Sequence, residues 1–410
     1  MRRFHYAWAV CLGGALSLFT IIGFGINVFS VYQPYLIELN GLTNAQASWI
    51  TTVRSLFSLI AMMTVNQLCA RIGIRRTMTL GILLLAASCA VFGLSDTFLP
   101  YCAAAALGGF SYGYGGMVPL ALVIGHWFRD RRSFALGLAS AGSGVSTIFA
   151  PALITRLIEL YGLRTAFLAE SAFVLLMAVL VWRLIRSAPE ELDMQPYHLG
   201  GDDVPPPPPK PAPAGMTRGL WCAVLFAAFL SGGPGGPGFS HLTVLYTSSG
   251  YDSMTVAGLL SFLGFMLSVG KIAGGQIYDV LGGRRGNTYM YGVFLLALCL
   301  GCLAPLGGMV IPIVAIVLFG LGFPLSAIPF AVWARDLRGS EGYERSVRTL
   351  NVAYAWGQLL FGPVPGVLAD WFDSYVPAYV MFLAVLLLSM RIVQYAYRRA
   401  EAGAEAESAV

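Results

Sequence analysis

Long apolar runs separated by short loops make up almost the whole chain. A membrane span needs about 20 consecutive apolar residues, so these runs predict about twelve transmembrane helices. Of the 410 residues, 57% are hydrophobic and 11% are charged, against about 25% charged in soluble domains. The chain is therefore expected to be solvated mainly by lipid. The runs fall at about 8–32, 46–69, 76–96, 99–126, 134–160, 164–186, 218–246, 254–278, 286–306, 308–333, 347–370 and 375–397.

The arginines of the loops predict the orientation, because cytoplasmic loops carry an excess of basic residues. One set of loops is rich in arginine, whereas the opposite set holds only Arg156 and Arg164. Both termini are therefore expected in the cytoplasm. The first apolar run lacks a cleavage signal and is interpreted as a retained span. Short loops favour a bacterial inner membrane. The arginine-rich loops and ends carry Arg2, Arg3, Arg71, Arg75, Arg76, Arg129, Arg131, Arg132, Arg284, Arg285, Arg335, Arg338, Arg345, Arg398 and Arg399.

Other function classes find little support in the composition. The net charge of +5 comes from short loops between apolar runs, so it does not indicate nucleic-acid binding. The seven cysteines are odd in number and scattered, so neither a disulfide framework nor a metal site is predicted. No nucleophile elbow, phosphate-binding loop, zinc-protease motif or dinucleotide fingerprint occurs in a suitable context. We expect no enzymatic activity, no cofactor and no metal.

A polar, proline-rich stretch divides the chain into two similar halves. Residues 187–217 cannot bury apolar area and are expected to form a disordered or polyproline-rich cytoplasmic linker. The expected domains are an N-terminal six-helix bundle at 1–186, this linker, a C-terminal six-helix bundle at 218–400 and a cytoplasmic tail at 401–410.

The halves repeat each other in sequence. ARIGIRR at 70–76 corresponds to DVLGGRR at 279–285, with an offset of 209. FAPALITRLIELYGLRTAF at 149–167 corresponds to FGPVPGVLADWFDSYVPAY at 361–379, with an offset of 212. Two six-span units of this kind are typical of alternating-access transporters, whose binding site lies near the membrane midplane. The expected fold is thus an all-α membrane protein with twelve helices in two pseudo-symmetric bundles.

Two cations lie inside apolar runs. Lys271 is the only charge in 256–276, and Arg54 lies within SWITTVRSLFSLIAMMTV. A cation at membrane depth costs at least about 2.5 kcal/mol on insertion scales, so it normally faces a water-filled cavity or an anionic ligand. For Lys271 the alternative is a structural ion pair, with Glu170 as a possible partner. For Arg54 the alternatives are a second anion contact, an extracellular gate or a side chain that snorkels to the interface.

The loop motif of each half resembles that of the major facilitator superfamily, whose pattern is G-x-x-x-D-x-x-G-x-R-R. The later copy matches it completely, whereas the earlier copy has Asn66 for the glycine and Ala70 for the aspartate. The resemblance implies an inner gate, which the missing aspartate would weaken in the first half. The gate residues that it implies are Arg71, Gly73, Arg75, Arg76, Gly275, Asp279, Gly282, Arg284 and Arg285.

Two longer segments resemble the monocarboxylate porters and the oxalate–formate antiporter group. HWFRDRRSFALGLASAGSGVS at 126–146 is similar to their fourth-to-fifth-span signature, and residues 239–279 are similar to their seventh and eighth spans. In those relatives an arginine in the eighth span binds the substrate carboxylate, and Lys271 occupies that position here. A lysine keeps the positive charge but lacks the bidentate fork of arginine.

The family arrangement of cavity-lining helices implies further contacts near mid-depth. For Tyr112 and Tyr114 helix packing is an equally good interpretation, and for the aromatic residues of the other spans packing is the usual role. His241 follows a glycine- and proline-rich break and is the candidate for carrying a coupling proton, although a hydrogen-bonded packing role competes. Glu170 is expected to pair with Arg164 or to snorkel. The candidate substrate contacts are Lys271, Arg54, Tyr112, Tyr114, Asn27, Ser268, Phe323, Ser326, Tyr354, Trp356 and Gln358.

These observations predict a secondary transporter of small organic anions, with monocarboxylates such as lactate or pyruvate as the leading substrates. Coupling is expected through proton symport or exchange of anions. The alternatives are a dicarboxylate such as oxalate, an aromatic acid, drug efflux or a non-transporting sensor on the same fold. The expected partners are the carboxylate, a proton or counter-anion and the lipid bilayer, without nucleic acid, and the chain is expected to act as a monomer.

Overall fold

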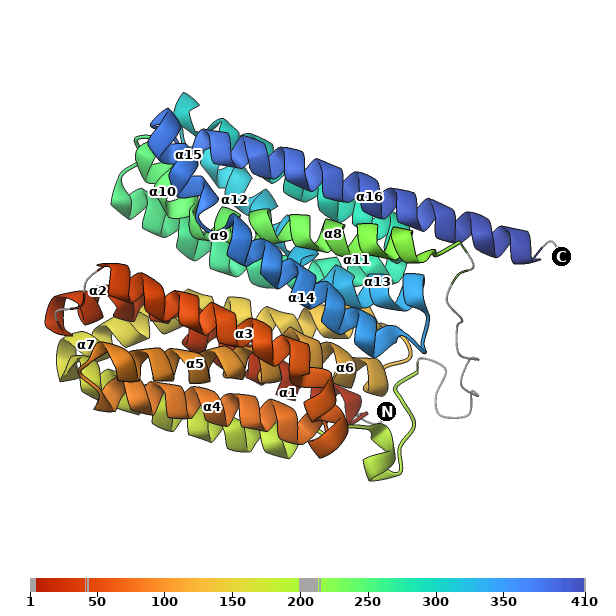
Figure 1. Cartoon of the computed structure of the whole chain (residues 1–410), viewed down its shortest axis with the longest axis horizontal. Helices are drawn as coiled ribbons and strands as arrows, with labels where there is room; N and C mark the ends of the chain where they lie inside the picture. Colours follow the sequence, from red (N-terminus) through yellow and green to blue (C-terminus); the bar gives the residue numbers. More distant parts are fainter. Residues whose placement is uncertain (1–4, 41, 43, 199–212, 214, 409–410) are drawn as a thin grey trace. The chain divides into compact units, whose positions relative to one another are not determined.

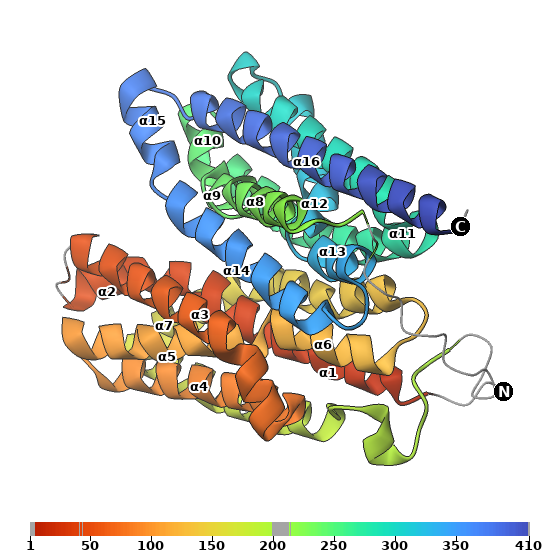
Figure 2. The same ribbon diagram turned by 45° about the vertical axis from the view of Figure 1, so that its right-hand side comes forward.

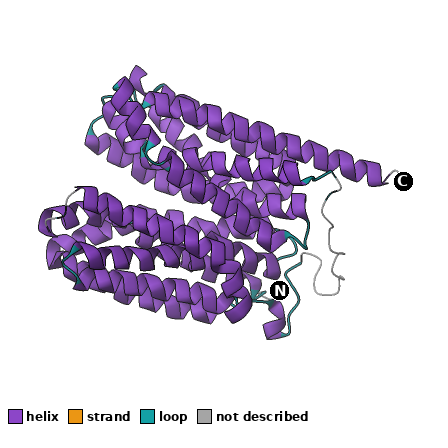
Figure 3. Cartoon of the chain, in the orientation of Figure 1, coloured by secondary structure: helices purple, strands orange, loops and turns teal. Residues whose placement is uncertain are grey.

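A computed structural model describes residues 5–408 except 41, 43, 199–212 and 214. The described residues form helices joined by short loops, with no strand among them apart from an isolated bridge between Phe128 and Tyr197 (Figure 3). An all-helical fold follows from the apolar runs, because a helix satisfies its own backbone hydrogen bonds in lipid.

The chain divides into two compact units, Met1–Pro205 and Pro206–Val410. In unit 1 the helices are α1 (Ala7–Leu18), the π-helix η1 (Phe19–Asn27), α2 (Phe29–Asn40), α3 (Asn44–Ile72), α4 (Ile74–Leu94), α5 (Phe98–Gly115), α6 (Met117–Trp127), α7 (Arg132–Leu184) and the 3₁₀ turn η2 (Pro189–Leu192). Within this unit α7 packs along α1 and α4, and α5 packs between α3 and α4 (Figure 1).

Unit 2 contains a similar series of helices. They are α8 (Arg218–Gly235), α9 (Pro237–Ser240), α10 (Leu242–Ser248), α11 (Ser253–Cys302), η3 (Ala304–Leu306), α12 (Val310–Gly322), η4 (Phe323–Ser326), α13 (Ile328–Arg338), α14 (Tyr343–Phe361), α15 (Val364–Phe372) and α16 (Val376–Ser408). Within this unit α8 lies beside α14 and α16, and α11 lies beside α12 and α16 (Figure 2).

Glycines with positive φ separate spans that otherwise run into one another. Gly162 (φ 81°, ψ 164°) interrupts α7, and Gly282 (φ 73°, ψ 176°) interrupts α11, so each of these helices contains two predicted spans. This region of backbone conformation is accessible essentially only to glycine. Nine helices of the described residues are long and apolar enough to cross a membrane, and the bent pair 310–326 and 328–338 adds one broken span. With α7 and α11 each divided at their glycines, the arrangement accommodates the twelve predicted spans.

Close helix contacts in both units depend on glycine. A Cβ atom at Gly113 of α5 would lie 2.2 Å from Ala61 Cβ of α3, and one at Gly357 of α14 would lie 1.9 Å from the Phe229 carbonyl oxygen of α8. Small residues at helix crossings permit such approach, which supplies much of the packing energy in lipid.

The beginning of the predicted linker is ordered. Residues 187–198 contain η2, and Tyr197 forms backbone hydrogen bonds with Trp127 and Arg129. The prediction of a disordered linker is therefore wrong for this part, because the chain next to α7 finds backbone partners at the end of α6. The polyproline stretch at 199–212 lies outside the described residues.

Candidate functional site

The middle of the first span in unit 1 is a π-helix, and side chains from two other spans reach it. Arg54 of α3 donates from Nη1 to the carbonyl oxygen of Gly25 in η1 at 3.1 Å, and its guanidinium carbon lies 4.8 Å from the centroid of the Phe29 ring. Asn27, the last residue of η1, donates from Nδ2 to Oγ1 of Thr147 on α7 at 2.7 Å. Single π-turns occur often at functional sites because they leave helix carbonyls available to other partners.

Two of the predicted unit 1 residues are thus brought to one segment, and the structure adds a third. Arg54 contacts η1, and Asn27 is its last residue. The third residue is Thr147, which was not predicted and which accepts the hydrogen bond from Asn27. Thr147 also donates to the Ser143 carbonyl oxygen at 2.8 Å, as an isolated packing threonine would. Nothing in the sequence distinguishes it from the other hydroxyls of this serine-rich helix.

The tyrosines of α5 point in different directions. Tyr114 lies 3.1 Å, oxygen to oxygen, from Thr64 of α3 and stacks on Phe110 with centroids 5.7 Å apart. Tyr112 is half-buried one turn before Gly116, where α5 ends. Residues two apart on a helix cannot share a face, so Tyr114 ties α5 to α3 while Tyr112 is directed elsewhere.

In unit 2 the predicted polar residues of η4 and α14 gather at the glycine-rich end of α8. A Cβ atom at Gly235 would lie 2.3 Å from the Tyr354 hydroxyl and 3.1 Å from Ser326 Cβ, and one at Gly236 would lie 2.8 Å from Gln358 Cγ. Gln358 Nε2 donates to the Tyr354 hydroxyl at 3.3 Å. Glycine is required here because any side chain would displace these groups.

The remaining candidates on α14 and η4 behave as packing residues. Trp356 lies two residues from both Tyr354 and Gln358, so it faces away from them and is 40% exposed. The Phe323 ring lies 5.3 Å from that of Phe239 and 5.9 Å from that of Phe319, centroid to centroid.

Lys271 is buried, with an exposed fraction of 7%, and so is Ser268 one turn earlier on α11. Their helix packs against the segment that carries Ser326. Cβ atoms at Gly270 and Gly274, on either side of the lysine, would lie 2.1 Å from the Gly320 carbonyl oxygen and 3.1 Å from Pro324 Cβ. The stretch of α11 that carries Lys271 therefore packs against α12 and η4, and η4 contains Ser326.

His241 lies at the junction of α9 and α10, outside regular helix. Its Nδ1 is 2.9 Å from the Pro237 carbonyl oxygen, so Nδ1 donates there when it carries the ring proton. The ring lies 6.0 Å from that of Tyr375. The geometry fits the hydrogen-bonded packing role that competed with proton carriage.

The two loop motifs, which are predicted to form a gate, each contact the last helical span of their own unit. Arg75 donates from Nε to the Trp182 carbonyl oxygen at 2.9 Å and lies over that indole ring at 3.8 Å. In the other copy, Arg284 pairs with Glu401 of α16. Arg71, Arg76 and Arg285 are exposed.

The position and the partner of Glu170 differ from those predicted. This glutamate is 3% exposed and accepts a hydrogen bond from the Tyr32 hydroxyl on Oε2 at 2.7 Å, whereas Arg164 is exposed. The pairing with Arg164 and the snorkelled position are both wrong, because the helix turn after Gly162 directs Glu170 into the core of unit 1.

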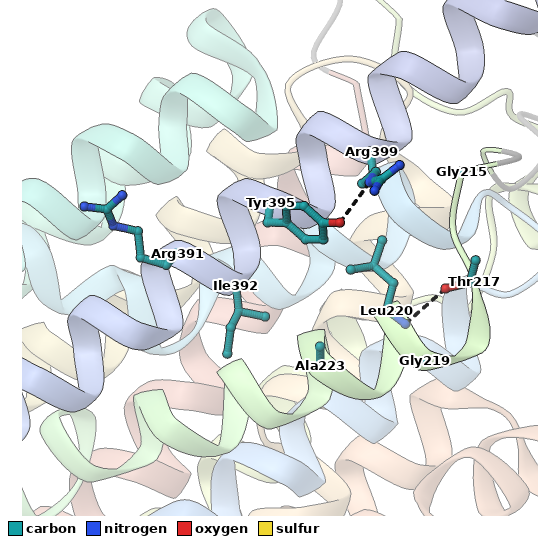
Figure 4. Close-up of a pocket in the computed structure, with 9 residues that line it drawn as sticks. All are labelled: Gly215, Thr217, Gly219, Leu220, Ala223, Arg391, Ile392, Tyr395 and Arg399. Carbon is teal, nitrogen blue, oxygen red and sulfur yellow. Dashed lines mark hydrogen bonds between the residues drawn. The ribbon is translucent and has the colours of Figure 1, made fainter.

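A cavity of about 670 Å³ lies elsewhere in unit 2, between the start of α8 and the last turns of α16 (Figure 4). Arg399 donates from Nε to the Tyr395 hydroxyl at 2.9 Å, and Thr217 caps α8 by accepting from the Leu220 amide at 3.2 Å. The cavity contains none of the predicted substrate contacts. Its lining is Gly215, Thr217, Gly219, Leu220, Ala223, Arg391, Ile392, Tyr395 and Arg399.

The described residues contain no group of three or more histidine, cysteine, aspartate or glutamate side chains that could hold a metal ion. Cys299 and Cys302 have a C-x-x-C spacing, but both are free thiols on α11.

Two units of apolar helices with buried polar groups define an integral, multi-pass membrane protein. A family model described as the Major Facilitator Superfamily matches residues 15–346. The chain belongs to the Major Facilitator Superfamily, whose members are transporters and not enzymes. This confirms the predicted fold, with its two six-helix bundles, and the resemblance noted in the loop motifs.

Relatives and solved structures agree with this assignment. The chain is 27% identical over 290 residues to the MFS-type transporter pytF of Aspergillus terreus, covering 67% of this chain and 90% of the relative. It is 26% identical over 313 residues to monocarboxylate transporter 12 of Mus musculus, covering 67% of this chain but only 63% of that protein.

Among solved structures, the proton:xylose symporter XylE matches with a TM-score of 0.70 at 13% identity, covering 94% of each chain. The human organic anion transporter MFSD10 matches with a TM-score of 0.69 at 16% identity, covering 95% of this chain and 99% of that one. At these identities the likeness concerns the fold.

Proposed function

We propose that this protein transports small organic anions by alternating access and that Lys271 neutralises the substrate carboxylate. The observation that carries the proposal is the burial of Lys271 on α11, in a stretch of helix that packs against η4, the segment that contains Ser326. The similarity to a monocarboxylate transporter supports the substrate class.

The free-energy cost of a charge in a low-dielectric environment supports this role of Lys271. A cation at membrane depth is costly, and a carboxylate substrate offsets part of that cost when it binds. The hydroxyls of Ser326 and Tyr354 can donate to a carboxylate oxygen, and the amide of Gln358 can do the same. We propose monocarboxylates such as lactate and pyruvate as the substrates, coupled to proton symport or to anion exchange.

A dicarboxylate or aromatic acid is the second candidate, and Arg54 is the observation that favours it. Its guanidinium group has five N–H donors, of which the bond to Gly25 uses one. A second cation available to substrate would select for a second carboxylate.

The experiment is uptake into liposomes that contain the purified protein, with labelled lactate, pyruvate, oxalate and benzoate. Lys271→Ala is expected to reduce carboxylate uptake by at least about 100-fold, as loss of a charged interaction worth about 3 kcal/mol does, and Lys271→Arg should retain part of the activity. Arg391→Ala, which removes an exposed cation of α16, is the control for purification and reconstitution.

Normal uptake by a folded Lys271→Ala protein would exclude the role of this lysine. Preference for oxalate that disappears in Arg54→Gln would instead establish the dicarboxylate alternative. Thermal unfolding of each variant separates loss of binding from loss of fold.

A further inference from the structure

A carboxyl group is enclosed in the aromatic core of unit 1. Glu170 and Tyr32 are 3% and 1% exposed, and the Tyr32 hydroxyl donates to Glu170 Oε2 at 2.7 Å. The Tyr32 ring stacks on Phe167, one turn before the glutamate, with centroids 3.8 Å apart and planes 14° apart. This stacking holds the hydroxyl on the carboxyl group.

The groups around the carboxyl are donors or apolar rings. From α2 it meets the Tyr32 hydroxyl, and from α4 it meets the Cys89 thiol, which also hydrogen-bonds to it. On its own helix α7 the neighbouring Phe167 stacks against Phe92 of α4 at 5.3 Å. No basic side chain of the described residues forms an ion pair with Glu170.

Aromatic rings stand between Glu170 and the cation Arg54. Its guanidinium lies over Phe29, whose ring is 5.4 Å from Phe92, and Phe92 in turn stacks on Phe167. One N–H of the guanidinium donates to the Gly25 carbonyl oxygen. Within the part of the chain that the structure describes, Glu170 therefore has no direct counter-charge.

Such a carboxyl can be neutralised by binding a proton. An ionised carboxylate in apolar surroundings costs several kcal/mol unless it is paired. One phenol and one thiol donor offset part of that cost, so the ionised form remains accessible as well. The two forms differ by one proton that is taken from water and returned to it.

We propose that Glu170 and Tyr32 form a proton-binding site of unit 1 and that this site supplies the coupling proton. The proposal rests on the proposed function for its transport role, whereas proton binding itself does not. Tyr32 belongs to α2, which follows η1 directly, so loss or gain of its hydrogen bond acts on the segment that contacts Arg54 and Thr147. Tyr32 positions the carboxyl group, and Glu170 holds the proton.

The transport test compares Glu170→Gln with Glu159→Gln. Glu159 is a matched control because it lies on the same helix, is exposed and pairs with Arg156 at 3.5 Å. In liposomes, Glu170→Gln is expected to lower proton-gradient-driven accumulation at least about tenfold, corresponding to about 1.4 kcal/mol. Exchange of labelled for unlabelled anion should change less than about twofold, because glutamine keeps the volume of the side chain and exchange needs no net proton movement. Unchanged accumulation by Glu170→Gln, with Glu159→Gln also unchanged, overturns the proposal.

A second measurement uses the wild-type protein and no substrate. Carbodiimides modify protonated carboxyl groups, so mass spectrometry of the purified protein should show labelling of Glu170 that declines between about pH 5 and about pH 9, the range of buried carboxyls. Tyr32→Phe keeps the stacked ring but removes the donor to the ionised form, so labelling should persist to higher pH.

Labelling of Glu170 that does not depend on pH, or is absent throughout, overturns the proton site even if transport is normal. Failure to transport any carboxylate overturns the proposed function instead and leaves the labelling result valid. The two failures are therefore distinguishable.

Discussion

The two halves share a backbone design but differ in their buried polar groups. Gly73 and Gly282, 209 residues apart, have φ and ψ of 86° and 154° in one unit and 73° and 176° in the other. Each motif then contacts the last span of its own unit at equivalent positions. Arg75 donates to the Trp182 carbonyl oxygen, whereas Gln394 donates to the Arg284 carbonyl oxygen at 3.1 Å.

The charges within the spans do not repeat. At the offset of 209, Arg54 corresponds to Leu263 and Lys271 corresponds to Met62; at the offset of 212, Glu170 corresponds to Phe382. All three counterparts are buried and apolar. The repeat therefore maintains the arrangement of the helices. The residues proposed to bind substrate and a proton lie at positions where the two halves differ in sequence.

The largest expected loss of stability comes from alanine at close helix contacts, and it tests whether both units depend equally on such contacts. Gly357→Ala places Cβ 1.9 Å from a backbone oxygen, and Gly113→Ala places it 2.2 Å from another Cβ. Neither neighbour is a flexible side-chain end, so each variant should lose about 3 kcal/mol or more, the upper range for overpacking. The readout is thermal unfolding in detergent.

Gly292→Ala on α11 is the matched control, because no atom lies within 4 Å of its Cβ. It should be neutral or stabilise by about 0.5–1 kcal/mol through helix propensity. If Gly113→Ala or Gly357→Ala melts like this control, the corresponding helix crossing is not as close as described.

The two glycines with positive φ in the loop motifs test whether the units share the same backbone turn. Gly73→Ala and Gly282→Ala should each cost about 1–3 kcal/mol, because both introduce a side chain in a conformation that favours glycine. No steric clash contributes, since the Cβ of Gly282 has nothing within 4 Å and that of Gly73 meets only Ser187 Oγ at 3.5 Å. Similar losses in melting temperature would confirm the shared turn. A loss confined to one unit would show that the two turns are not equivalent.

The smallest effect separates the two arginine contacts. Arg75 has a hydrogen bond to a backbone oxygen and a stacked indole ring, so Arg75→Ala should cost about 1–2 kcal/mol. Arg284 pairs with Glu401 in a half-exposed position, with side chains 40% and 46% exposed, so Arg284→Ala should cost less than about 1 kcal/mol. The check is thermal unfolding at low and high salt.

Only the loss at Arg284 should shrink as salt increases, because screening acts on exposed ion pairs. A larger or more salt-sensitive effect at Arg75 would show that its contact is mainly ionic and that the two copies are more alike than their partners suggest.

The span pattern was accessible from sequence because it depends on local properties. A run of about 20 apolar residues has to be helical in lipid, and the repeated loop motif marked the loops that contain Gly73 and Gly282. The repeat also located the division of the chain. Lys271 was found in the same way, since one charge in a long apolar run is visible without knowledge of packing.

The partners of the polar groups were not accessible in this way. Trp356 was predicted together with Tyr354 and Gln358, yet the helix directs it to the opposite face. The wrong pairing of Glu170 had a similar cause, since its true partner, Tyr32, lies 138 residues away.

Residue types and spacing thus determined which segments span the membrane and where charges fall within them. Only the tertiary structure decided that η1 is a π-helix whose Gly25 carbonyl binds Arg54, and that Tyr32 meets Glu170. The physical reason is that a span's apolar character is a property of neighbouring residues. A hydrogen bond between spans instead depends on how two helices are rotated and shifted against each other.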